Sequence, residues 1–215
     1  MVAPRVFVSV GARYTPQQER FLDELEDFLR NRCGCDPRII GKNEYPDGNP
    51  LTHIRDVMLS CHGVLVVAFE RTRVVSGKEK PGSSGERNVD GLSYTTPWNH
   101  IESAIAFGLK MPLYILCETG LKEEGLIESK LDWRVQILDL TKKDLERVDV
   151  AESLRAWVTK RVVPYAKSPR AAKALLGSLK LSEMTFKEIG IMLGTLTAAF
   201  AAGAAFARWL PKLFG

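Results

Sequence analysis

The run "GVLVVAFE" (residues 63–70) is the most apolar of the segments that could form strands, and it decides the fold. A strand with one solvated face would alternate apolar and polar residues, but this run is apolar at every position from Val64 to Phe69. A strand buried on both faces is typical of the centre of a parallel sheet covered by helices. We therefore expect a central parallel strand here.

The segments on either side of this run alternate between strand and helix patterns over residues 1–165. Thr15 followed by Pro16 is a helix start, because Thr caps the first turn and Pro suits its first position. The expected strands are 5–11, 37–41, 63–70, 112–118 and 133–140, and the expected helices are 15–32, 49–61, 97–109 and 141–165. Five strands with intervening helices predict a doubly wound parallel α/β sheet. Ligands of such sheets bind beyond the carboxyl ends of the strands.

The connection 70–96, "ERTRVVSGKEKPGSSGERNVDGLSYTT", is unusually long for a compact domain. It is polar and rich in Gly and Ser. Long loops of this kind usually serve as lids or are disordered. We interpret it as a mobile lid or interaction loop, with a passive insertion as the alternative.

Composition bounds the class of protein. The chain has 215 residues, of which 45% are hydrophobic and 26% are charged. Its formal net charge is only +4, and it lacks a dense Lys/Arg tract. We therefore expect no nucleic-acid partner. The cysteines have no zinc-ligand spacing, and buried thiols are favoured over a disulfide. The three histidines are scattered, so no metal site is expected. The first residues read as a strand, so we expect no signal peptide and a cytoplasmic N-terminal domain.

The composition changes after residue 165. Residues 166–187 are basic and predict a juxtamembrane linker or helix, and 188–210 predict a single-pass C-terminal transmembrane helix that anchors the chain in a membrane. The nineteen residues 189–207 carry no charge and nearly match a bilayer core of about 30 Å. The alternatives are a helix packed within an oligomer and an interfacial helix. Small residues recur every four positions and point to self-association; they are Gly190, Gly194, Ala198 and Ala202.

One acidic residue, Glu102, lies inside the apolar pattern of "TTPWNHIESAIAFGLKMPLYILCE" (95–118). On a helix that starts near Pro97, Trp98 and Glu102 are four residues apart and share a face. The helix N-terminus favours the carboxylate, whereas burial beside Trp98 would raise the pKa of Glu102. Such a carboxylate could stabilise or attack a sugar cation, or bind ribose hydroxyls. The alternative is a role in helix-dipole charge or a surface salt bridge.

Loops at the same edge supply further candidates for substrate binding. Gly11 would allow close backbone approach, Arg13 could pair with a phosphate, and Tyr14 could stack on a base. The turn-rich loop 41–50 and the end of the central strand offer the other candidates, which are Asn43, Tyr45 and Phe69. The alternatives are an ordinary turn after the first strand and a solvated loop at 41–50.

The strands, the W-x-x-x-E at 98–102 and the "A-x-A-x-G-L-K-M-P" that follows resemble a TIR-like domain. More broadly, residues 5–160 resemble the superfamily that joins TIR domains with nucleoside deoxyribosyltransferases, which has a flavodoxin-like fold. The resemblance implies cleavage of the N-glycosidic bond of NAD, as substrate rather than cofactor, with Glu102 as the catalytic glutamate and Trp98 at the nicotinamide pocket. It also implies a homo-oligomeric, antiphage effector that is active once assembled.

Three rival functions remain open from the sequence. The first is a non-enzymatic sensor of a nucleotide or a protein, coupled to a membrane-perturbing helix. The second is a nucleoside deoxyribosyltransferase, which would exchange bases without phosphate contacts. The third is a TIR adaptor in which Glu102 is incidental.

Overall fold

The computed structural model describes residues 3–45, 48–128, 134–169 and 171. Its centre is a five-stranded sheet in the order β2-β1-β3-β8-β9, with every neighbouring pair parallel. The strands are β1 (Arg5–Val10), β2 (Asp36–Ile39), β3 (Gly63–Ala68), β8 (Leu113–Glu118) and β9 (Arg134–Leu138). The predicted parallel α/β sheet is confirmed, and its strand order fits a flavodoxin-like fold. The strand order reverses beside β1, so a ligand site is expected at the carboxyl ends of β1 and β3.

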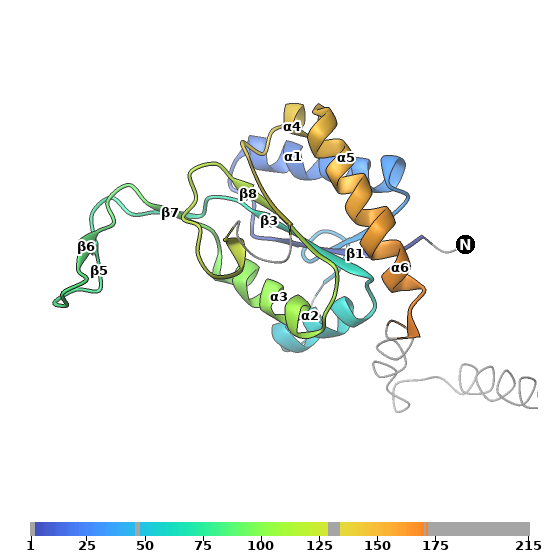
Figure 1. Ribbon diagram of the computed structural model, residues 1–215, viewed down its shortest axis with the longest axis horizontal. Helices are drawn as coiled ribbons and strands as arrows, with labels where there is room; N and C mark the ends of the chain where they lie inside the picture. Colours follow the sequence, from blue (N-terminus) through green and yellow to red (C-terminus); the bar gives the residue numbers. More distant parts are fainter. Residues whose placement is uncertain (1–2, 46–47, 129–133, 170, 172–215) are drawn as a thin grey trace, which may run out of the picture. The chain divides into compact units, whose positions relative to one another are not determined.

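Helices cover both faces of the sheet, with α2 (Pro50–Leu59) and α3 (Pro97–Gly108) on one face. Figure 1 shows α1 (Pro16–Asp27) and α5 (Val148–Trp157) on the other face. Side chains of one strand alternate between the two cores, because successive residues of a strand point to opposite faces. Thus Val8 packs in the core with α1 and α5, whereas Phe7 packs in the core with α2 and α3. All six residues of β3 are buried, as its apolar sequence predicts.

Two predicted helices are less regular than expected. The Thr15 side chain caps α1 by accepting from the Gln18 N–H, and the π-helical turn η1 (Phe28–Arg32) follows the helix. The predicted helix 141–165 is interrupted, because Arg147 has an extended backbone with ψ of 132°. The segment forms α4 (Lys142–Glu146), α5, the π-helical η3 (Val158–Val162) and α6 (Val163–Ala166).

The connection 70–96 forms an arm with two short antiparallel ladders. The first ladder joins β4 (Thr72–Arg73) to β7 (Ser93–Tyr94), and the second joins β5 (Lys78–Glu79) to β6 (Arg87–Asn88). Figure 1 shows the arm extending from the body of the domain at the end where β3 leads into it. The Lys122 ammonium, in the loop that follows β8 and contains the short helix η2 (Gly125–Ile127), lies 5.2 Å from the Tyr94 ring. The segment is therefore a folded ribbon rather than a structureless loop.

The remaining predictions concern the C-terminal segment, the cysteines and a metal site. The predicted transmembrane helix 188–210 and most of the linker 166–187 lie outside the described residues. In the described part, no helix is long and apolar enough to cross a bilayer. All four cysteines are free thiols, and Cys61 and Cys117 are buried, as predicted for these two. Among these same residues, no group of three or more His, Cys, Asp or Glu is arranged to hold a metal ion.

Candidate active site

Glu102 lies on the buried side of α3, and only 6% of it is exposed. Burial raises the pKa of Glu102 to about 7, because a carboxylate loses hydration inside the protein. A hydrogen bond from the Ser9 hydroxyl opposes this shift, since the donor stabilises the charged form. The pKa of this carboxyl group therefore lies near neutral pH.

Ser9 belongs to a chain of buried polar groups at the carboxyl end of β1. The Thr95 hydroxyl donates to Asn99 Oδ1 at 2.8 Å, and the Asn99 amide donates to Ser9 Oγ at 3.0 Å. The Ser9 hydroxyl then donates to Glu102. Every hydrogen-bond donor in this series points toward the carboxyl group of Glu102. The series therefore favours the carboxylate form of Glu102.

The same amide fixes α3 against the sheet. Asn99 Nδ2 also lies 3.2 Å from the Ser9 carbonyl oxygen and 3.5 Å from that of Val67, so it contacts both central strands. The Ser103 hydroxyl donates to the Asn99 carbonyl oxygen one turn further along the helix. These contacts place the first turns of α3, with Glu102, directly over the ends of β1 and β3.

Gly11 lies where β1 ends, close to the start of α3. A Cβ atom at this position would lie 3.0 Å from Thr96 Cγ2, which is tighter than most van der Waals contacts. A glycine therefore lets the loop after β1 approach the residue that caps α3. A small cavity of about 10 Å³ lies at this junction, lined in part by Gly11, Phe69 and Asn99.

A larger cavity of about 580 Å³ lies at the same edge of the sheet. Phe69, Glu70 and Arg71 line both the larger and the small cavity. Tyr14 and Arg20 also line the larger cavity. Phe69 is buried and packs edge-on against Phe21, so it forms a fixed wall between the two spaces. Asn99 lines the small cavity and not the larger one.

Positive charge and an aromatic ring are combined at the mouth of the larger cavity. The Arg71 guanidinium lies 5.7 Å from the centre of the Tyr14 ring, and 60% of Tyr14 is exposed. Within the described residues, neither Arg20 nor Arg71 forms an ion pair, whereas Arg73 pairs with Glu70 at 2.7 Å. Unpaired guanidinium groups and an exposed ring suit a phosphorylated ligand that carries a base.

The structure does not bring all predicted binding residues to these cavities. Arg13 pairs with Glu19 at 3.2 Å and lines neither cavity. The Asn43 amide closes its own turn, accepting from the Ile39 N–H at 2.7 Å. Tyr45 and Trp98 line neither cavity and are 69% and 41% exposed. Gly11, Tyr14 and Phe69 do lie around the two cavities.

Glu102 is itself not among the residues that line either cavity. It is separated from solvent, and Asn99, three residues earlier on α3, lines the small cavity. A sugar could reach the carboxyl group only if the first turn of α3 or the loop after β1 moved. The arrangement is chemically suited to hold a reactive carboxyl away from water until a ligand enters.

Ser9, Asn99 and Arg20 were missed by sequence reasoning. Ser9 is a polar residue within the apolar strand β1, and Asn99 lies in the first turn of α3. A polar residue at a position expected to be buried is a usable signal, because buried polar groups need hydrogen-bond partners. The pairing itself joins residues 90 positions apart, and no local pattern predicts it.

No known family model matches the chain, and no curated protein matches it. Among solved structures, it is similar to the CMP N-glycosidase BcmB of Clostridium botulinum, with 17% sequence identity and a TM-score of 0.44. The match covers 68% of this chain and 98% of that chain. A likeness of this size does not indicate which reaction this chain catalyses.

Proposed function

We propose that the chain is a nucleotide N-glycosidase that acts on NAD, with Glu102 as its catalytic carboxylate. One observation carries the proposal: a buried carboxyl, with its pKa raised to about 7, ends a series of hydrogen-bond donors at the carboxyl edge of the sheet. Enzymes tune carboxyl groups to such values by burial, and perturbed groups beside a cavity are typical of active sites.

In the proposed reaction, the bond between C1′ of the ribose and the nicotinamide nitrogen breaks. The electron pair of that bond leaves with nicotinamide, which becomes neutral, and a positive charge develops on the ribosyl ring. The Glu102 carboxylate stabilises this charge or forms a transient ester with C1′. Water then adds to C1′ and releases a proton, so the products are nicotinamide, ADP-ribose and H⁺.

The residues around the larger cavity are assigned to substrate binding. Arg20 and Arg71 approach the phosphates, since their guanidinium groups are unpaired within the described residues and line the cavity. The exposed Tyr14 ring stacks on a base, and Phe69 forms the wall of the pocket. The access step is a movement of the first turn of α3 or of the loop after β1, since Glu102 is 6% exposed.

Further parts of the proposal rest on the sequence. We propose that residues 188–210 anchor the protein in a membrane as a single-pass helix with the catalytic domain in the cytoplasm. Concentrating chains in two dimensions would promote self-association and complete the sites. The resemblance to TIR-like effectors adds a role in defence against phage by depletion of NAD.

A second candidate function is binding of a nucleotide without turnover. One observation favours it, because Glu102 is 6% exposed and lines neither cavity. In this case the Tyr14 and Arg71 cavity would sense the nucleotide, and Glu102 would couple ligand binding to movement of α3.

Release of nicotinamide from NAD by full-length protein in liposomes tests the proposal against this rival. Wild type, Glu102→Gln and the control Glu146→Gln are compared; Glu146 is an exposed carboxylate on α4. The enzyme proposal predicts release by wild type and Glu146→Gln alone, with binding of NAD retained in Glu102→Gln. Binding of NAD with no release by any of the three proteins would favour the sensor.

A further inference from the structure

A third cavity, larger than the two at the carboxyl edge, lies at the opposite edge of the sheet from Glu102. Its volume is about 1030 Å³, near the upper end of the range of about 300–1,000 Å³ for small-molecule sites. Leu113 and Tyr114 line it at the start of β8, and Arg134 lines it at the start of β9. Glu102 lies over the carboxyl ends of parallel strands, so the two sites are at opposite ends of the sheet.

Basic side chains without ionic partners surround this cavity. Lys110, Lys160 and Arg161 line it, and none of them forms an ion pair within the described residues. Two acidic residues also line the cavity. Each of them already pairs with an arginine that does not line the cavity. Asp149 pairs with Arg147 at 2.8 Å, and Glu152 pairs with Arg155 at 2.7 Å. The wall is therefore left with uncompensated positive charge, which attracts anions.

The floor of the cavity is aromatic. The rings of Tyr114 and Trp157 have centroids 5.6 Å apart and are tilted by 56°. The Tyr114 hydroxyl is satisfied, with Ser153 Oγ at 2.8 Å. Trp157 is 7% exposed, and its indole Nε1 is buried with no hydrogen-bond partner among the described residues. A buried N–H without an acceptor is rare and costs about 1–3 kcal/mol.

We propose that this cavity binds a phosphate monoester that carries an aromatic ring, at a site separate from the one that contains Glu102. The phosphate lies between Lys160 and Arg161, whose side chains are exposed and can adjust to it. The ring packs against Trp157, which keeps 7% of its surface exposed, whereas Tyr114 is fully buried. The inference is independent of the N-glycosidase proposal, because no residue named here lines the cavities at the carboxyl edge.

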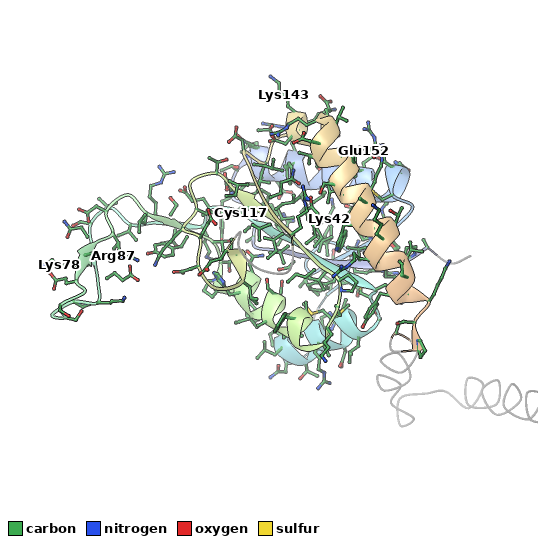
Figure 2. The ribbon with its side chains drawn as sticks, in the orientation of Figure 1. Lys42, Lys78, Arg87, Cys117, Lys143 and Glu152 are labelled. Carbon is green, nitrogen blue, oxygen red and sulfur yellow. The ribbon has the colours of Figure 1, made fainter. Side chains whose placement is uncertain are left out.

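The test is calorimetric titration of the full-length protein with 1-naphthyl phosphate, with 1-naphthol and inorganic phosphate as partial ligands. The variant Arg161→Glu reverses a charge on the cavity wall. The control Lys143→Glu makes the same charge change on α4, at a residue that does not line the cavity. Figure 2 labels Lys143 beside α4 and Glu152 beside α5; Glu152 lines the cavity, and Lys143 does not. Thermal melts confirm that both variants are folded, and Lys160→Ala is a second cavity variant.

The proposal predicts saturable binding of one 1-naphthyl phosphate per chain to this cavity, with weaker binding of both partial ligands. Arg161→Glu should raise the dissociation constant about tenfold or more, whereas Lys143→Glu should change it less than about twofold. Absence of this binding, equal binding of 1-naphthol, or equal loss in both charge variants would overturn it. Loss of binding in Arg71→Glu but not in Arg161→Glu would place the ligand at the carboxyl edge and would also overturn it.

Discussion

The side-chain amide of Asn99 donates to Ser9 Oγ at 3.0 Å and joins α3 to β1 across 90 residues of sequence. Ser9 in turn donates to Glu102, so the position of the helix and the ionisation of the carboxyl group depend on the same contact. A displacement of α3 that exposed Glu102 to a substrate would also change this hydrogen bond. The exposure of Glu102 and the pKa of its carboxyl group are therefore linked.

Asn99→Ala should lower the free energy of unfolding by about 2 kcal/mol, because it leaves buried partners on Thr95 and Ser9 without their hydrogen bonds. Urea unfolding measures the change. Asn31→Ala is the matched control, since Asn31 is an exposed asparagine that bonds to the neighbouring Asp27. The control should change the free energy by less than about 0.5 kcal/mol. Equal losses in both variants would contradict a structural role for the buried amide.

Glu102→Gln should stabilise the protein above neutral pH. The pKa of Glu102 is raised from 4.5 to about 7 in the folded protein, so the unfolded chain ionises first. Wild-type stability should therefore fall as the pH rises from about 4.5 to about 7 and then level off, whereas Glu102→Gln lacks this fall. The difference should reach on the order of 3 kcal/mol at pH 8 and vanish near pH 4.

Urea unfolding of both proteins at several pH values measures this difference, with Glu146→Gln as the exposed control. A constant difference between wild type and Glu102→Gln at every pH would show that burial does not raise the pKa of this carboxyl group. The control should follow the wild-type curve throughout.

Ser9→Ala should raise the pKa of Glu102 further, since it removes the hydrogen bond that favours the carboxylate. The pH at which the wild-type stability curve levels off should then move upward. The same unfolding measurements record the shift, with Ser9→Ala compared to the double variant Ser9→Ala, Glu102→Gln. An unchanged curve in Ser9→Ala would mean that the hydroxyl does not stabilise the ionised carboxyl group.

Arg71→Ala should raise the KM for NAD about tenfold while kcat changes less than about twofold, because the arginine contacts phosphates that do not react. Steady-state release of nicotinamide measures both constants. Arg32→Ala is a close control, since the guanidinium groups of Arg32 and Arg71 each lie 5.7 Å from an aromatic ring. A fall in kcat with constant KM in Arg71→Ala would contradict its assignment to phosphate binding.

Much of the fold could be predicted because its signals are local. The apolar run at 63–70 is buried at every position of β3, and Thr15 caps α1 as its position suggests. The interruption at Arg147 was not predicted, since it follows from the extended backbone of one residue between two short helices. The ladders of the arm were also missed, because each strand has two residues and gives no periodic pattern.

The site was predicted less completely than the fold. Glu102 could be selected because it is a carboxyl in an apolar helix pattern, and its burial agrees with that pattern. Ser9 and Asn99 could not be selected from the sequence, because their contact depends on the packing of α3 over β1. From its spacing, Trp98 was expected to share a face with Glu102, but Trp98 is 41% exposed whereas Glu102 is 6% exposed. Helical spacing gives a shared side of the helix and does not fix the depth of burial.

The measurement that tests the central claim most directly is the pH dependence of kcat/KM, which reports the ionisation of the free enzyme, for cleavage of NAD by full-length protein in liposomes. The leaving nicotinamide carries a positive charge before the bond breaks and needs no added proton, so the active form of Glu102 is the carboxylate. The rate should rise through a midpoint at about pH 7 and level off above it, with Glu102→Gln inactive throughout. A rate that falls with rising pH, or turnover by Glu102→Gln at the wild-type rate, would contradict the account.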